Sequence, residues 1–282
     1  MTADVTQVAS HDLGVPERLP GCAPPPATDG YLLGGRVRYA QPREGFRSGI
    51  EPVFLAAAIP ARSGERVLEG GSGAGAALLC LAVRVPALRG LGVERDPSLV
   101  ALATHNAEAN GAVGLAFVAG NLTTLRGPDL GGGPFDHALA NPPYHSPAGS
   151  ISPLAARVSA KRAEPGLLAA WARALVAPLR HRGTLTFILP AGSLPEGLVA
   201  MTAAGCPANS VLPLWPKLGR PAKLVLVHGV KGGRAPLRLL PGLVLHEADG
   251  RYTQAAESIL REAAPVNLAR SAGEAEMRKQ RG

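Results

Sequence analysis

The chain has 282 residues, of which 46% are hydrophobic, and its formal net charge is +8. So much apolar material provides a sizeable core, which excludes an intrinsically disordered protein. Three cysteines lie far apart without a CxxC pair, which argues against a disulfide framework or a zinc site. Neither an apolar run of about 18 residues nor a signal-peptide pattern is visible, so we expect a cytoplasmic protein without a membrane span or a bound metal.

The predicted elements fall into three parts. Residues 1–30 predict a flexible N-terminal arm, residues 31–265 a single domain, and residues 266–282 a basic polar tail. A helix is predicted over 51–59, with Pro52 in its first turn. Further helices are predicted at 74–84, 97–110, 161–180, 194–204 and 252–263, and strands at 65–70, 89–94, 115–120, 135–140, 183–189, 209–215 and 222–230.

The alternation of strands and helices predicts an α/β protein with a Rossmann-like, doubly wound mixed sheet of about seven strands. Two short apolar runs follow, at 237–239 and 243–246, separated by Pro241 and Gly242. A Pro-Gly pair is typical of a turn, so these runs are consistent with a hairpin.

A glycine-rich stretch joins the first long strand to the helix that follows it. Gly71, Gly73 and Gly75 let the backbone pass close to a ligand, and the helix N-terminus offers free N–H groups. Glu94 ends the next strand, 19 residues after Gly75. An acid at a spacing of about 20 suits the hydroxyls of a ribose, although Asp96 and Pro97 would also form an ordinary helix start.

Two polar turns follow later strands. Asn121 comes after the strand at 115–120, where its side chain would meet an adenine or would simply form an Asx turn. The second turn reads Asn141-Pro142-Pro143-Tyr144. Two prolines forbid a helix and leave an amide, carbonyl oxygens and an aromatic face, which together suit a planar amine or amide. The alternative is a rigid turn with an incidental tyrosine.

Taken together, these motifs resemble those of class I S-adenosylmethionine-dependent methyltransferases, and more narrowly those that methylate amino groups through an NPPY motif. Residues 41–51, Gly219–Lys223 and Gly250–Thr253 resemble the bacterial family that methylates the N6 amine of an adenine beside the anticodon of valine tRNA. The chain departs from the pattern where Glu69-Gly70 replaces Asp-Leu, Asn121 replaces Asp and Glu51 replaces Asp.

The resemblance implies a class I methyltransferase fold over residues 31–265, S-adenosylmethionine as cofactor and tRNA as partner. It assigns catalytic roles to Asn141, Pro142 and Tyr144. The cofactor would contact Glu51, Glu69, Gly71, Gly73, Gly75, Glu94 and Asn121.

Charge supports a nucleic-acid partner, because residues 1–150 carry a net charge of −2 whereas residues 151–282 carry +10 and all five lysines. The predicted substrate contacts are Pro143, Arg162, Lys217, Arg220, Lys223 and Lys231. Three alternatives stay open: a glutamine methyltransferase that modifies release factors, a DNA adenine methyltransferase, although no separate target-recognition domain is visible, and a non-catalytic RNA-binding protein on a degenerate methyltransferase fold.

Overall fold

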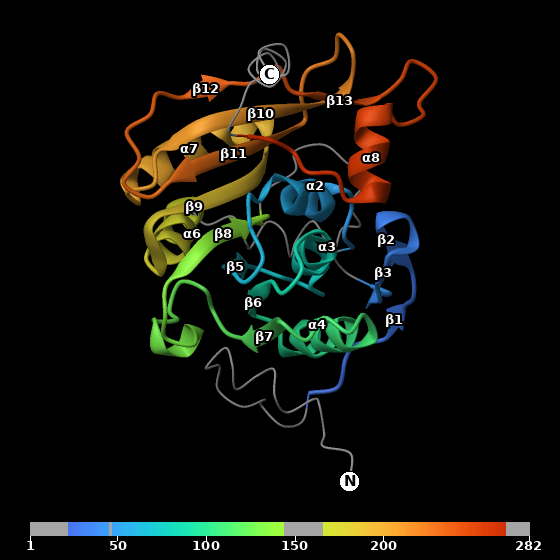
Figure 1. Cartoon of the computed structure of the whole chain (residues 1–282), viewed down its shortest axis with the longest axis vertical. Coiled ribbons are helices and arrows are strands. Elements are labelled where there is room, and N and C mark those ends of the chain that lie inside the picture. Colours follow the sequence, from blue (N-terminus) through green and yellow to red (C-terminus); the bar gives the residue numbers. More distant parts are fainter. Residues whose placement is uncertain (1–21, 45–46, 144–165, 269–282) are drawn as a thin grey trace.

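The computed structural model describes residues 22–44, 47–143 and 166–268. A nine-stranded sheet forms its centre, with the order β12-β10-β11-β9-β8-β5-β6-β7 and with β13 also beside β10 (Figure 1). The strands are β5 (Arg66–Gly70), β6 (Arg89–Glu94), β7 (Leu115–Ala119), β8 (Phe135–Ala140), β9 (Leu179–Pro190), β10 (Ala208–Lys217), β11 (Leu224–Val230), β12 (Arg238–Leu239) and β13 (Leu243–His246).

Strands β5 to β9 run parallel to one another, and β11 is antiparallel to both β9 and β10. Strands β5, β6 and β8 are buried over most of their length, as expected for parallel strands covered on both faces, whereas the edge strand β7 is mostly half-buried. The predicted doubly wound mixed α/β sheet is therefore confirmed, and its seven principal strands lie where the sequence predicts them.

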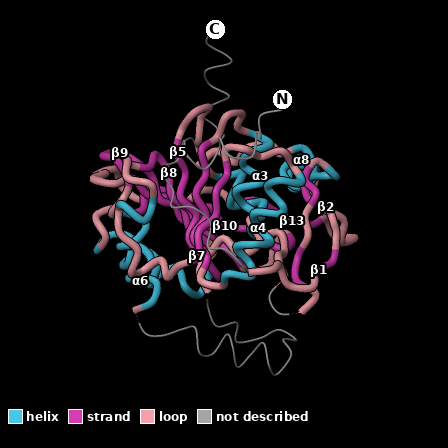
Figure 2. The backbone as a smooth tube through the Cα atoms, turned by 90° about the horizontal axis from the view of Figure 1, so that it is seen from below, coloured by secondary structure: helices cyan, strands magenta, loops and turns pink. Residues whose placement is uncertain are grey.

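Helices cover both faces of the sheet, as Figure 2 shows from below. Helices α2 (Glu51–Ala58), α3 (Ala76–Arg84), α4 (Pro97–Ala109) and α8 (Gln254–Glu262) contribute to one apolar core, whereas α6 (Leu167–Val176) and α7 (Leu194–Ala203) contribute to the other. Local sequence fixes the ends of several helices. Pro52 occupies the first turn of α2, Asp96 caps α4, and the Thr253 hydroxyl accepts a hydrogen bond from the Ala256 N–H at the start of α8.

Short strands precede the main sheet. Strand β1 (Ala27–Thr28) pairs with β4 (Gln41–Pro42), and β2 (Tyr31–Leu32) pairs with β3 (Val37–Arg38). The last residues of the predicted flexible arm are therefore paired into the fold. At the other end, Leu268 is buried and its carbonyl oxygen accepts hydrogen bonds from Ser210 and Arg238, so residues just after 265 also pack against the sheet.

The helix predicted at 161–180 is too long at its C-terminal end. Helix α6 ends at Val176, and β9 begins at Leu179 rather than at residue 183. Pro178 explains the correction, because proline cannot donate the next helical hydrogen bond, and Ala177 is the last residue whose N–H donates within the helix, to the Arg173 carbonyl. Residues 161–165 lie outside the described part.

The prediction of a hairpin around Pro241 and Gly242 is wrong. Both β12 and β13 pair parallel with β10 instead of with each other. The Pro-Gly step therefore interrupts one extended edge segment without reversing it. The indole N–H of Trp215, on β10, donates to the Pro241 carbonyl at 3.1 Å and keeps the Pro-Gly step beside that strand.

Candidate active site

The chain changes direction in the sheet between β5 and β8. From β5 it proceeds outward to β6 and β7, and then returns to the other side of β5 as β8. In open α/β sheets, ligands bind at such a switch point, outside the carboxyl ends of the strands. Gly70 at the end of β5 is directly opposite Ala140 at the end of β8. The glycine loop and the Asn141 turn therefore leave the sheet side by side.

The glycine loop needs its glycines for two different reasons. Gly71, Gly73 and Gly75 all have positive φ, at 66°, 54° and 86°. A Cβ on Gly71 would collide with the ring of Trp171, and one on Gly75 would collide with Phe117. At Gly73, by contrast, a Cβ would meet no atom within 4 Å. The loop is thus packed at both ends and open at its middle, which leaves room for a ligand to approach the backbone.

Glu69 is a buried carboxyl group beside this loop. Its side chain is 4% exposed, and its Oε2 has no hydrogen-bond partner among the described residues. Burial raises the pKa of Glu69 to about 8, a hydrogen bond from the Leu78 N–H opposes that shift, and the nearby Glu94 charge adds to it. An unpaired buried oxygen at a ligand-binding edge suits a cationic or hydrogen-bond-donating ligand group.

Glu94 closes the glycine loop from the neighbouring strand. Its two oxygens accept hydrogen bonds from the Gly73 N–H and the Asp96 N–H, each at 3.0 Å. A carboxylate offers about four lone-pair sites, so these two bonds leave capacity for ligand hydroxyls. Asp96 separately caps α4 by accepting from the Ser98 N–H at 2.9 Å. The cap and the predicted ribose-binding acid are therefore two different residues.

The predicted motif turn begins at this same edge. Asn141 and Pro143 are half-buried and Pro142 is buried, directly after β8. Tyr144 and Arg162 lie outside the described residues.

The sequence also predicts cofactor contacts for Asn121 and Glu51, which do not belong to the glycine loop. The Asn121 Oδ1 accepts from the Thr123 N–H and hydroxyl, so this residue forms the Asx turn that was the alternative reading of its sequence. Glu51 is the first residue of α2 and lies over Gly49. No hydrogen bond connects Glu51 to Glu69 or Glu94 within the described residues.

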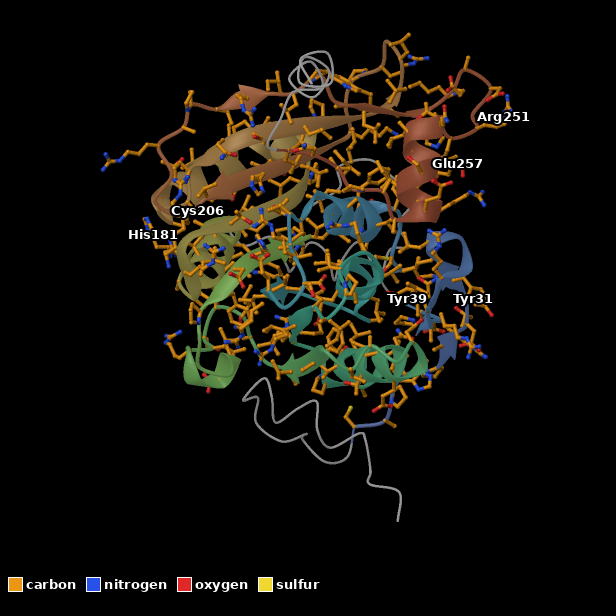
Figure 3. The ribbon with its side chains drawn as sticks, in the orientation of Figure 1. Tyr31, Tyr39, His181, Cys206, Arg251 and Glu257 are labelled. Carbon is orange, nitrogen blue, oxygen red and sulfur yellow. The ribbon has the colours of Figure 1, made fainter. Side chains whose placement is uncertain are left out.

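The predicted basic contacts divide between opposite edges of the sheet. Lys217, Arg220 and Lys223 belong to the β10–β11 connection, and Leu224 at its end is directly opposite Pro190, the last residue of β9. This connection is therefore at the carboxyl edge, together with the glycine loop. Arg220 and Lys223 are exposed, whereas the Lys217 ammonium donates to the Ala248 carbonyl at 2.9 Å. Figure 3 shows Arg251 on the outer loop between β13 and α8.

The predicted role of Lys231 as a substrate contact needs to be corrected. It follows β11 at the amino edge of the sheet, and its ammonium donates to the carbonyl oxygens of Val176, Ala177 and Leu179 at 2.9, 3.0 and 2.7 Å. An ammonium has three N–H donors, and here all three are used. Lys231 therefore stabilises the end of α6 and has no donor left for a phosphate.

Sequence reasoning missed Asn106 and Trp171. Trp171, on α6, packs against Gly71, and Asn106, on α4, is buried and hydrogen-bonded to the end of the glycine loop. The signal for Asn106 was available: it shares the buried face of α4 with Leu102 and Ala103, where an amide needs a specific partner. Trp171 gave no such signal because only the fold brings α6 to the loop.

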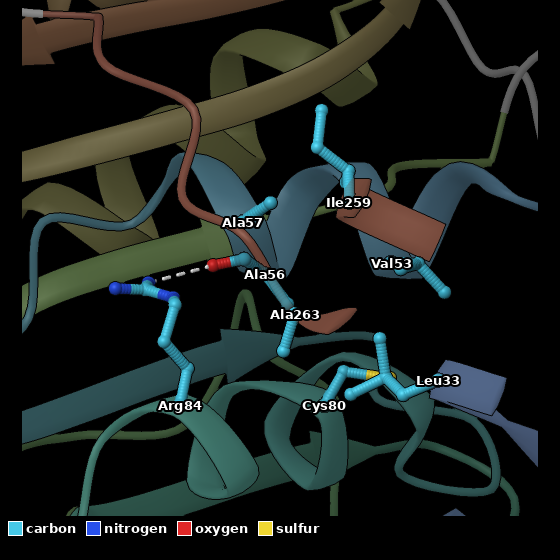
Figure 4. A pocket seen from close by; sticks show the side chains of 8 residues that line it. All are labelled: Leu33, Val53, Ala56, Ala57, Cys80, Arg84, Ile259 and Ala263. Atoms are coloured by element: carbon cyan, nitrogen blue, oxygen red, sulfur yellow. Dashed lines mark hydrogen bonds between the residues drawn. The ribbon is translucent and has the colours of Figure 1, made fainter. Parts of the chain in front are cut away.

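A small cavity lies elsewhere, between α2, α3 and α8 (Figure 4). Its lining is mostly apolar, and Arg84 at its rim donates to the Ala56 carbonyl at 3.0 Å. The lining residues are Leu33, Val53, Ala56, Ala57, Cys80, Arg84, Ile259 and Ala263. The described ranges contain neither a group of three or more potential metal ligands nor a helix long and apolar enough to cross a membrane.

The sheet order, the switch point and the glycine loop define a class I methyltransferase fold. Residues 51–165 match the family described as the methyltransferase small domain. A predicted O-methyltransferase from Agrobacterium tumefaciens has a similar structure, with a TM-score of 0.62, 22% identity, and coverage of 77% of this chain and 98% of that one. A methyltransferase from Pyrococcus furiosus aligns with a TM-score of 0.52 and 20% identity over 70% of this chain and 90% of its own.

Among curated proteins, the release factor glutamine methyltransferase of Rhodospirillum rubrum is 35% identical over 127 residues. That alignment covers 41% of this chain and 38% of the relative, so the chain matches well under half the length of that protein. The family match and the fold support S-adenosylmethionine as the cofactor of this domain. The open middle of the glycine loop and the unpaired Glu69 oxygen fit such a group.

Proposed function

We propose that this protein is an S-adenosylmethionine-dependent N-methyltransferase that acts on a planar exocyclic amine. One observation carries the proposal. The Asn141-Pro142-Pro143 turn leaves the sheet directly beside the glycine loop, because Ala140 and Gly70 are paired across the switch point. A receptor for a planar N–H₂ group and a site for the methyl donor therefore share one edge of the sheet.

The cofactor, when bound, supplies a methyl group on an electrophilic sulfonium. The protein then has mainly to orient the acceptor. The Asn141 side-chain oxygen and the Pro142 carbonyl would accept the two N–H hydrogens of the target amine, which directs the nitrogen lone pair toward the methyl group. The same acceptors stabilise the positive charge that develops on nitrogen before a proton leaves to solvent. Tyr144 would stack on the target ring, a contribution of about 1–3 kcal/mol in other base-binding sites.

Glu69 and Glu94 would hold the donor from the β5 and β6 ends. The unpaired Oε2 of Glu69 is suited to the ammonium of the methionine part, and a cation there would favour the carboxylate form. Glu94 would accept from the ribose hydroxyls while it keeps its bond to the Gly73 N–H. These roles would leave Asn121 as a support of the loop after β7.

For the substrate we propose the N6 amine of an adenine in tRNA, in agreement with the resemblance to the enzymes that act beside the valine anticodon. The net charge of +10 after residue 150 supports a polyanion. Arg220 and Lys223 are exposed at the same edge as the Asn141 turn, where a loop with an unstacked base would approach.

A second candidate substrate is the glutamine side-chain amide of a release factor. The 35% identity to a release factor glutamine methyltransferase supports it over the matched 127 residues. The same turn would accept the two hydrogens of a carboxamide, so the turn by itself does not separate the two substrates. The basic C-terminal half favours RNA.

The two substrates are separated by one experiment. The protein is incubated with methyl-labelled cofactor and with separate pools of tRNA, ribosomal RNA, DNA and purified release factor. We expect label in tRNA, and digestion to nucleosides should yield N6-methyladenosine. Label in the release factor alone would overturn the RNA substrate but keep the N-methyltransferase. If calorimetry detects no cofactor binding at all, the result favours the non-catalytic RNA-binding alternative over a methyltransferase.

Replacing Asn141 tests the proposed receptor. We expect Asn141→Ala to lower kcat by about 100-fold or more, the loss typical when an oriented transition-state partner is removed. Affinity for S-adenosylhomocysteine should stay within about twofold. Single-turnover rates and calorimetry on the same preparation measure the two quantities. Turnover that survives within a few-fold would show that Asn141 does not hold the reacting amine.

A further inference from the structure

Asn106 is a buried amide that joins two segments far apart in the sequence. It lies on α4, is 1% exposed, and uses its side chain in three hydrogen bonds. Its Oδ1 accepts from the Ala40 N–H at 2.9 Å, and its Nδ2 donates to the Ala40 carbonyl at 2.9 Å and to the Ala74 carbonyl at 3.0 Å. Ala40 precedes β4, whereas Ala74 lies between two glycines of the glycine loop.

These bonds fix one peptide group of the loop at both of its ends. The carbonyl of the Ala74–Gly75 peptide is held by Asn106, and its N–H, on Gly75, donates to the Ser72 carbonyl at 2.8 Å. Gly73 and Gly75 have positive φ, so this part of the chain has more alternative conformations available than any other residue type would allow. Fixing the peptide therefore removes freedom where the loop is otherwise most adaptable.

Asn110, one turn later on the same helix, provides a comparison. Its Oδ1 accepts from the Arg38 N–H at 2.8 Å, and its Nδ2 donates to the Arg38 carbonyl at 2.7 Å. Asn110 thus ties the N-terminal segment to α4 as Asn106 does. Its Nδ2 also donates to the Asn106 carbonyl at 2.7 Å, so this third bond stays within the last turn of α4 and does not reach the glycine loop. Asn110 is less buried and caps the end of α4, and of the two asparagines Asn106 is the one that bonds to Ala74 of the glycine loop.

We propose that Asn106 is a positioning residue for the cofactor, through which the N-terminal segment at Ala40 and the glycine loop at Ala74 are held in one arrangement. This inference rests on the proposed function, because it assumes that the glycine loop binds S-adenosylmethionine. It follows that the cofactor, by ordering the glycine loop, also orders residues 37–42, because the buried Asn106 side chain connects the two segments. Asn110 stabilises the same segment without this coupling.

The matched pair Asn106→Ala and Asn110→Ala tests the proposal. Each variant loses its bonds to the N-terminal segment, so both should melt at a lower temperature than the wild type. We expect Asn106→Ala to bind S-adenosylhomocysteine about tenfold more weakly by calorimetry, within the usual range for coupled sites. Asn110→Ala should bind it within twofold of the wild type. Measurements are made at a temperature where circular dichroism shows both variants fully folded.

Hydrogen exchange on the unmodified protein gives a second test if Asn106→Ala does not fold. The Ala40 amide donates directly to Asn106, so S-adenosylhomocysteine should slow exchange in a peptide that contains Ala40 by several-fold, together with exchange in the glycine loop. Protection confined to residues 71–75 would overturn the proposal, as would equal affinities of the two variants. Failure of the wild type to bind S-adenosylhomocysteine would instead overturn the proposed function.

Discussion

At the scale of single residues, Glu69 has the most strongly altered ionisation of the groups around the proposed site. It is buried in the ligand-free protein, and burial raises its pKa from 4.5 to about 8. In the unfolded chain this carboxyl is ionised at neutral pH, whereas in the folded chain it holds its proton. The stability that it contributes is complete below pH 4.5 and is lost as the pH rises through 8.

We therefore expect the free energy of unfolding of the ligand-free protein to fall by about 2 kcal/mol between roughly pH 6.5 and pH 8. Glu69→Gln cannot ionise and should show no such fall. Urea unfolding at several pH values measures both proteins. The window avoids the buried His228, whose pKa is lowered to about 4 and whose effect lies in more acidic solution. Glu262→Gln, an exposed change at the end of α8, should keep the wild-type pH dependence.

At the scale of elements, α6 is held by a cation from a distant strand end. The last carbonyls of a helix carry partial negative charge and lack partners within the helix. Lys231 donates to the Val176 and Ala177 carbonyls at this end of α6 and to the Leu179 carbonyl at the start of β9, and Pro178 makes the helix stop there. The same helix carries Trp171, which packs on Gly71. The position of α6 therefore affects the wall of the candidate site.

Lys231→Met should lower the free energy of unfolding by about 2 kcal/mol, because three hydrogen bonds from a charged group to partly buried or exposed carbonyls are lost while the aliphatic stem is kept. Its affinity for tRNA should be unchanged at a temperature where it is folded. Lys223→Met, at the opposite edge of the sheet, should leave stability within about 0.5 kcal/mol and weaken tRNA binding. Chemical unfolding and filter binding distinguish the two. Reversed effects of the two substitutions would contradict both assignments.

At the scale of the whole molecule, we expect basic residues at the two opposite edges of the sheet to have different roles. Arg220 is exposed at the carboxyl edge with the glycine loop, whereas Arg234 is exposed on the β11–β12 connection at the amino edge. Both are single arginines on surface connections of the same sheet. They form a matched pair for locating the polyanion.

Arg220→Gln should weaken tRNA binding and reduce the slope of log K against log salt by about 0.7–0.9, the change expected when one phosphate contact is lost. Arg234→Gln should leave the slope unchanged. Fluorescence anisotropy of labelled tRNA over a range of salt concentrations measures both. Equal slopes for the two variants and the wild type would show that RNA does not approach the carboxyl edge through Arg220.

Local signals in the sequence were enough to predict the order of the elements and the ends of the strands around the candidate site. Apolar periodicity, proline positions and helix caps act over a few residues, so the strands that end at Gly70, Glu94 and Ala140 were predictable. The same local signals failed where a partner from elsewhere decides the outcome. The segment at 237–246 is an interrupted edge strand because β10 is available to pair with it in parallel.

The partners of the side chains, by contrast, depend on contacts between segments that are distant in the sequence. The fold placed the Asn141 turn beside the glycine loop and directed Lys231 to the end of α6, whereas the Asx turn of Asn121 is local and was one of the two outcomes predicted from its sequence. It also gave Asn106 its partners in two distant segments. The physical reason is that hydrogen-bond capacity and burial depend on neighbours brought together by the sheet. The type of a residue determines which hydrogen bonds its side chain can donate or accept, and the fold determines the partners of those hydrogen bonds.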